Sequence, residues 1–140
     1  MFDKNYNEME MGARWTSGAR TITEADIINF AGISGDFYAL HMDREYAAKS
    51  VFGQRIAHGM LVLSYSTGLL DLKPGYVQAF YGMDKVRFVK PVFIGDTIHV
   101  ELEVVGKKDR EKGGVVTVKN EIKNQADETV AACDMKMFMK

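Results

Sequence analysis

The second half of the chain alternates between apolar and polar residues, which is the pattern of β-strands with one buried face. The alternation is clearest over 97–104, where Thr, His and Glu separate the apolar residues at even positions. Further segments with this pattern are 85–88, 115–122 and 130–138. Gly95-Asp96 marks a turn, and we expect the charged stretch 107–112, which two glycines follow, to be a solvated hairpin tip. The pattern predicts four or five antiparallel strands.

Residues 57–72 lack this alternation and are mostly apolar or small. Their number suits a helix of roughly 24 Å at 1.5 Å per residue, and a helix that is apolar nearly all round is buried. Its few small and polar residues fall on one side, facing close backbone packing or a site: Ser64, Thr67, Gly68 and Asp71. Shorter helices are expected after Thr23, ending at Gly32 and Gly35, and over 45–49. The predicted fold class is α+β, a hotdog domain in which a long antiparallel sheet wraps around a central apolar helix.

Composition and charge limit the partners and the compartment. The 140 residues suit one domain, 1–140, and a net charge of −1 without a basic stripe argues against nucleic acid or a membrane surface as partner. The lone Cys133, expected in the core, excludes an internal disulfide, and the N-terminus lacks a signal-peptide pattern, so we expect a cytoplasmic protein. One sheet over one helix leaves an edge and a face thinly covered, which predicts a homodimer or higher homo-oligomer.

The residues best suited to chemistry stand just before the apolar helix. Asp36 and His41 are five residues apart, and Ala57-His58-Gly59-Met60 opens the helix. Taken singly, each of these residues has a purely structural explanation. Asp36 follows a glycine and is typical of a turn, and His41 beside Leu40 is typical of a buried core histidine. Gly59 can be explained by close packing. Together, an acid/base pair beside a helix N-terminus can move protons at a carbonyl compound and hold the resulting oxyanion. This combination favours lyase chemistry on a thioester.

The other histidines do not add a metal site. We expect His58 to be structural and His99 to lie on the surface of a strand. No second His or Cys stands at a ligand spacing to His41 or His58, so no metal is expected. No glycine-rich loop suggests a nucleotide cofactor, and the CoA of a thioester substrate is the only nucleotide expected.

Three segments, in order, resemble the MaoC-like, R-specific enoyl-CoA hydratase family. The resemblance covers the chain from about residue 20 to its C-terminus. The matching residues are Gly35-Asp36, Leu40-His41, Tyr46-Ala47-Ala48, Ile56 to Met60, and Val86 to Val92 followed by Gly95-Asp96-Thr97. Tyr38 and Ala39 depart from the family, which usually has Asn and Pro at these places. These departures concern the range of substrates more than the class of reaction.

The resemblance implies a hydratase or dehydratase that interconverts trans-2-enoyl-CoA and (R)-3-hydroxyacyl-CoA, with a helical segment overhanging the hotdog domain. It implies that Asp36 and His41 hold and deprotonate the water, and that the N–H of Gly59 binds the thioester oxygen. It further implies that Thr67 orients Asp36, and that Tyr38 fills acyl-pocket volume or donates a hydrogen bond.

Two other functions are compatible with this fold. A thioesterase would need a carboxylate on the central helix, and residues 59–70 contain none. A catalytically silent acyl-CoA-binding hotdog protein is the second alternative, since Tyr38 and Ala39 could reshape the loop and exclude water.

Overall fold

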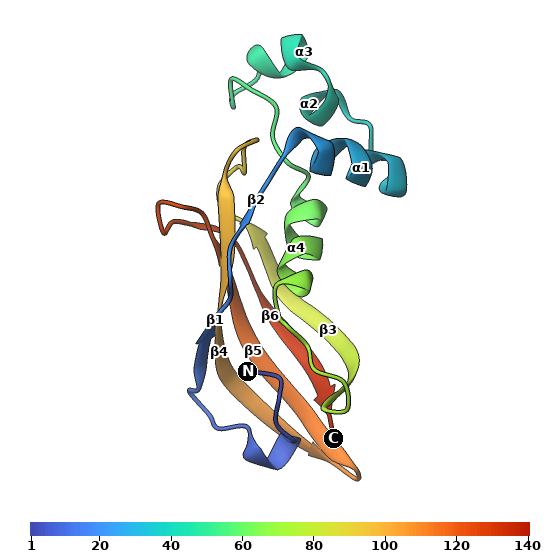
Figure 1. Cartoon of the computed structure of the whole chain (residues 1–140), viewed down its shortest axis with the longest axis vertical. Helices are drawn as coiled ribbons and strands as arrows, with labels where there is room; N and C mark the ends of the chain where they lie inside the picture. The colour runs from blue at the N-terminus through green and yellow to red at the C-terminus, as the bar shows by residue number, and fades with distance from the viewer.

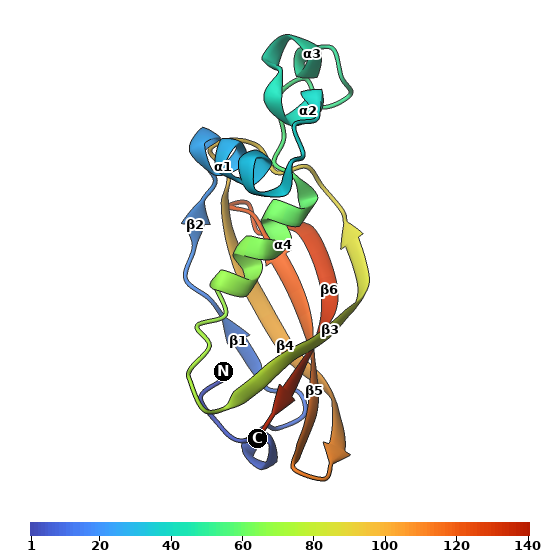
Figure 2. The same ribbon diagram turned by 90° about the vertical axis from the view of Figure 1, so that its right-hand side faces the viewer.

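The computed structural model describes residues 1–140, in which an antiparallel sheet curls around helix α4, Gly59–Gly68 (Figures 1 and 2). The strands are β1 (Arg14–Thr16), β2 (Arg20–Thr21), β3 (Val77–Phe88), β4 (Thr97–Arg110), β5 (Gly113–Lys123) and β6 (Thr129–Met139). Their order is β1-β4-β5-β6-β3, with β2 also paired to β4. The predicted hotdog architecture is confirmed.

The core forms where the alternating apolar positions of the sheet meet one side of α4. On β4 every second residue from Ile98 to Val104 is buried, as the period of two requires. The helix contributes Leu61, Val62 and Leu63 to the same apolar cluster. Cys133 of β6 is buried in this cluster, in agreement with its predicted place in the core.

Three short helices stand at one end of the sheet, above the start of α4 (Figure 1). They are α1 (Glu24–Ser34), α2 (Ala39–Met42) and α3 (Arg44–Ala48), and a 3₁₀ turn, Tyr6–Glu8, lies near the N-terminus. The predicted cap of α1 is confirmed, because the Thr23 hydroxyl accepts from the N–H of Asp26 and Gly35 ends the helix at φ 78°. The helical overhang that the family resemblance implies is therefore present.

A buried carboxylate joins the overhang to the central helix. One oxygen of Asp26 on α1 accepts from the hydroxyl of Tyr65 on α4 at 2.6 Å and from the Arg20 guanidinium at 3.1 Å. Burial opposes ionisation of Asp26, but hydrogen bonds from Tyr65 and Thr23 and the charge of Arg20 outweigh it and lower the pKa of this carboxyl. These contacts hold α1 against α4.

Some predicted boundaries are wrong. The central helix starts at Gly59 and stops at Gly68 instead of spanning 57–72, and Asp71 follows in a left-handed conformation at φ 50°. It is also not buried all round, since Met60 is 61% exposed and borders an open hollow of about 460 Å³ with Phe80 of β3. This side of α4 has no layer of the same chain over it.

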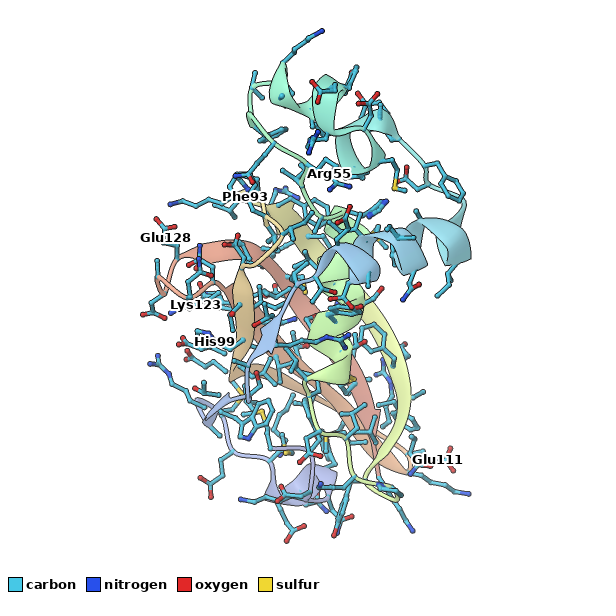
Figure 3. The ribbon with its side chains drawn as sticks, turned by 45° about the horizontal axis from the view of Figure 1, so that its top comes forward. Arg55, Phe93, His99, Glu111, Lys123 and Glu128 are labelled. Carbon is cyan, nitrogen blue, oxygen red and sulfur yellow. The ribbon has the colours of Figure 1, made fainter.

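The hairpin between β4 and β5 and helix α2 also differ from expectation. Strand pairing continues to Arg110 and Gly113, leaving only Glu111 and Lys112 as the tip (Figure 3). The paired strands satisfy the backbone of this charged stretch, while Lys107 donates to the carbonyl of Met9 and Asp109 accepts from the hydroxyl of Tyr6. The polar composition concealed this pairing. Helix α2 was not predicted, because its four residues are too few for a helical period. None of the helices is both long enough and apolar enough to cross a membrane.

Candidate active site

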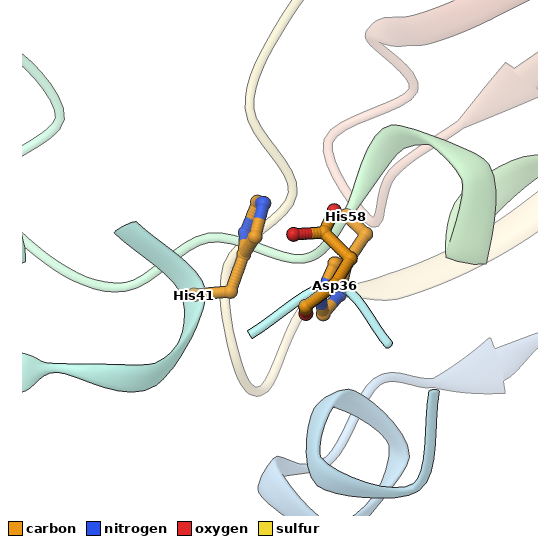
Figure 4. Close-up of side chains that lie close together, drawn as sticks. All are labelled: Asp36, His41 and His58. Atoms are coloured by element: carbon orange, nitrogen blue, oxygen red, sulfur yellow. The ribbon is translucent and has the colours of Figure 1, made fainter. Parts of the chain in front are cut away.

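Asp36, His41 and His58 come together between the overhang and the start of α4 (Figure 4). Asp36 follows the glycine cap of α1, His41 lies in α2, and His58 directly precedes α4. One carboxylate oxygen and one ring nitrogen from each histidine lie within 4.8 Å of one another. A single water can bridge polar atoms at such a separation. The predicted proximity of Asp36 and His41 is therefore present in the structure.

The carboxylate of Asp36 is exposed and held by the local chain. Its Oδ1 accepts from the backbone N–H of Tyr38 at 3.2 Å, an Asx turn, for which an Asp after Gly was the available signal. Within one chain the predicted contact from Thr67 is not made, since that hydroxyl donates to the carbonyl of Ser64 at 2.7 Å. Thr67 lies near the far end of α4, eight residues or roughly 12 Å beyond Gly59, so it cannot reach Asp36 of its own chain.

His41 is buried and presents one free nitrogen to the site. Its Nδ1 lies 2.8 Å from the carbonyl oxygen of Ile56, and because a carbonyl only accepts, Nδ1 carries the proton. Neutral His41 therefore has a lone pair on Nε2, the atom available to take a proton from water. The sequence pattern did not reveal this partner, because any residue supplies a backbone carbonyl.

His58 is 2% exposed and contacts the backbone of Asp36 and the ring of His41. Its Nε2 donates to the backbone carbonyl of Asp36 at 2.9 Å, and its ring stacks on that of His41 at a centroid distance of 3.9 Å. Its Nδ1 is buried without a partner. Burial lowers the pKa of His58 although the hydrogen bond to Asp36 opposes this, so the folded protein favours the neutral ring.

This lowered pKa predicts that acid destabilises the protein through His58. In the unfolded chain the ring takes a proton below about pH 6.5, whereas the folded chain resists it, so stability present above that pH falls as the pH drops towards the folded pKa. The slope for one proton is at most about 1.4 kcal/mol per pH unit. We expect urea unfolding at pH 7.5 and 5.5 to show a smaller loss of stability in His58→Phe than in the parent chain. An equal loss in both would contradict the prediction.

Gly59 opens an apolar cavity of about 360 Å³ that His41 also lines. The N–H of this first helical residue has no partner within the helix, and the helix dipole favours negative charge beside it. A side chain here would force the ring of Phe88 to move, since a Cβ on Gly59 would come 2.6 Å from it. Phe88 and Val130 also line this cavity, so His41 borders an apolar space.

Tyr38 lies beside His41 rather than in the wall of this cavity. It is 55% exposed, and its ring meets His41 edge-on at 6.0 Å between centroids. Its hydroxyl is 3.2 Å from that of Tyr46, and this hydrogen bond raises the pKa of Tyr38. The acyl-pocket role considered for Tyr38 therefore has no support from its position in one chain.

Two clusters contain possible metal ligands, and in both the other contacts argue against an ion. The rings of His41 and His58 are stacked at 29°, so their in-plane lone pairs do not converge on a point about 2 Å from each, as zinc requires. The second cluster, His99, Glu101 and Asp127, has Lys123 at 2.9 Å from Glu101 and 3.6 Å from Asp127. Figure 3 labels His99 and Lys123. His99 is partly exposed, as expected of a residue on the polar face of a strand.

Comparison with known proteins identifies the family. The model of the MaoC like domain matches residues 8–126, and the chain therefore belongs to this family. Protein MaoC of Klebsiella aerogenes is 46% identical over 102 residues, which are 72% of this chain and 30% of that protein. The (R)-specific enoyl-CoA hydratase of Rhodospirillum rubrum is 40% identical over 88 residues, or 63% of this chain and 61% of the hydratase.

A solved structure resembles the whole chain. It is named as the monoamine oxidase regulatory protein of Archaeoglobus fulgidus, is 44% identical, and superposes with a TM-score of 0.91 over 98% of this chain and 95% of that one. The chain spans less than two thirds of the two curated relatives, and the names divide between a hydratase and proteins called MaoC or regulatory.

Proposed function

We propose that the protein adds water to trans-2-enoyl-CoA thioesters to give (R)-3-hydroxyacyl-CoA, and catalyses the reverse dehydration. The observation that carries this proposal is the position of His41, which lies beside Asp36 and lines an apolar cavity together with Gly59, whose helix N–H is free. The configuration of the product is included because a relative 40% identical is named an (R)-specific hydratase. CoA belongs to the substrate, and no further cofactor is proposed.

The chemistry follows from the free atoms of the site. Water held between the Asp36 carboxylate and Nε2 of His41 loses a proton as its oxygen attacks Cβ. Electrons move from the C=C bond to the thioester oxygen, where the N–H of Gly59 stabilises the enolate. A proton returned from the pair to Cα restores the thioester and completes the addition. The hydrogen bond from Nδ1 of His41 to Ile56 keeps Nε2 facing the water throughout.

The test is hydration of crotonyl-CoA and longer trans-2-enoyl-CoAs, followed by the loss of conjugated thioester absorbance and chiral analysis of the product. We expect (R)-3-hydroxyacyl-CoA from at least one substrate. Binding of the acyl-CoA without turnover across the series would reject the hydratase and favour a silent acyl-CoA-binding protein.

We also propose that the protein is a homodimer that pairs along β3. This edge strand and the uncovered side of α4 expose large apolar side chains, including Phe80, Tyr81 and Met60. An uncovered apolar edge favours pairing with a second chain. Sedimentation should give twice the chain mass, and Phe80→Glu should shift it towards the monomer. A parent chain that sediments as a monomer at micromolar concentration would overturn this proposal.

A further inference from the structure

His58 contacts every part of the candidate site from one buried position. It is the N-cap residue of α4, so its backbone leads directly into Gly59. Its side chain bonds to the backbone of Asp36, stacks on the ring of His41, and meets the ring of Phe30 on α1 at 5.0 Å between centroids. It therefore links the loop, α1, α2 and α4.

We propose that His58 is a positioning residue, which sets the Asp36 loop through its N–H and the ring plane of His41 through stacking. The proposal rests on the proposed hydratase function, because it assigns His58 to the same reaction. It goes beyond the structural role expected from the sequence. Proton transfer itself remains with Asp36 and His41.

The two contacts act on different groups. The carbonyl of Asp36 only accepts, so His58 must keep its proton on Nε2 to hold the loop. The carboxylate is attached to that same residue, and it is otherwise held only by the local turn to Tyr38. Loss of the donor should therefore displace Asp36 while leaving His41 in place.

The stack acts on His41. Its ring is held at one nitrogen by Ile56, a contact that still permits the plane to tilt about that bond. The ring of His58, stacked at 3.9 Å and inclined by 29°, restricts this tilt and hence the direction of the Nε2 lone pair. When His41 takes a proton and becomes cationic, a second positive charge beside it would repel it, so His58 must stay neutral. The titratable groups facing His58 are Asp36 and His41. Its buried Nδ1 has no hydrogen-bond acceptor that would stabilise a second proton. His58 is thus suited to support the charge and not to carry it.

Two substitutions separate these contacts. His58→Phe keeps a ring that can stack and removes the N–H, whereas His58→Gln keeps an N–H and removes the ring. Both variants should fold, because Nδ1 makes no hydrogen bond and the Asp36 carbonyl lies in an exposed loop that water can reach. His99→Gln, on the polar face of β4, is the control for loss of a histidine elsewhere.

The experiment measures kcat and KM for enoyl-CoA hydration in each variant, alone and combined with Asp36→Asn or His41→Ala. We expect each His58 variant to lower kcat about 10- to 100-fold with KM changed less than about 3-fold, since small displacements of catalytic groups have effects of this size. In an Asp36→Asn background the effect of His58→Phe should disappear, and in a His41→Ala background that of His58→Gln should disappear. The proposal would be overturned if the kcat reductions of the single variants multiplied in full in the double variants. It would also be overturned if the loss of activity in each His58 variant equalled its fraction of unfolded protein.

A readout independent of activity separates this proposal from the hydratase function. Ring nitrogen NMR should show His58 protonated at Nε2, and amide exchange over 36–41 should be about 10-fold faster in His58→Phe than in the parent. If the parent hydrates no substrate, the hydratase function fails, and these measurements alone decide the positioning role. Unchanged exchange together with an Nδ1-protonated His58 would reject it.

Discussion

Replacing Asp36 with asparagine should lower the hydration rate of a trans-2-enoyl thioester about 10²- to 10⁴-fold while the protein remains folded. The amide keeps the shape of the side chain and the turn to Tyr38, but it cannot take a proton from water. The side chain is exposed and contributes no core packing, so its replacement should leave the unfolding curve unchanged. His41→Ala should reduce the rate by a similar factor, with a larger loss of stability because this ring is buried and hydrogen-bonded.

Asp43→Asn is the matched control for Asp36→Asn. Asp43 is an exposed carboxylate seven residues away, and its Oδ1 accepts from the N–H of Tyr46 to cap α3. Asparagine caps a helix nearly as well as aspartate, so this variant should retain both stability and activity. Initial rates at saturating crotonyl-CoA, with circular dichroism of each protein, make the comparison. Equal rates in Asp36→Asn and the parent would contradict the assignment of Asp36 as a catalytic residue.

Gly59→Ala should lower the hydration rate by about 10²-fold, the usual loss when one oxyanion contact fails. The methyl group would overlap the Phe88 ring at 2.6 Å and project into the wall of the cavity, beside the N–H that the thioester oxygen needs. Phe88 is 54% exposed and can rotate away, so the cost in stability should stay near 1 kcal/mol or below. We therefore expect Gly59→Ala to show a large drop in the hydration rate but only a small shift of the urea unfolding curve.

Two variants distinguish blocking of the N–H from simple crowding. Gly68→Ala adds the same methyl group at the other end of α4, where nothing lies within 4 Å, and should leave the rate unchanged. Gly59→Ala combined with Phe88→Leu relieves the overlap but leaves the methyl group beside the N–H. This double variant should unfold like the parent and remain slow. Recovery of full activity would mean that Gly59 serves only to accommodate Phe88.

The relation of the overhang to the sheet explains why part of the site escaped prediction. Asp36 and His41 lie close in sequence, so a loop and one turn of helix suffice to bring them together. His58 is 22 residues from Asp36, and their contact exists because Asp26 binds Tyr65 and holds α1 beside α4. From its sequence position His58 resembles an ordinary residue at the start of a helix. The tertiary contacts of the overhang place it next to Asp36 and His41.

The amino-acid sequence by itself determined strands β4 to β6 and the end of β3, the cap of α1, and the pairing of Asp36 with His41, because these depend on side-chain periodicity and on neighbours a few residues apart. Strands β1 and β2 and the first part of β3 were not predicted. Only the tertiary structure decided that α4 stops at Gly68, that Thr67 points away from Asp36, and that His41 bonds to Ile56. The physical reason is the same in each case. Any residue can offer a backbone carbonyl, and any ring can stack on another. Which groups lie close enough to do so depends on how the sheet and helices pack together.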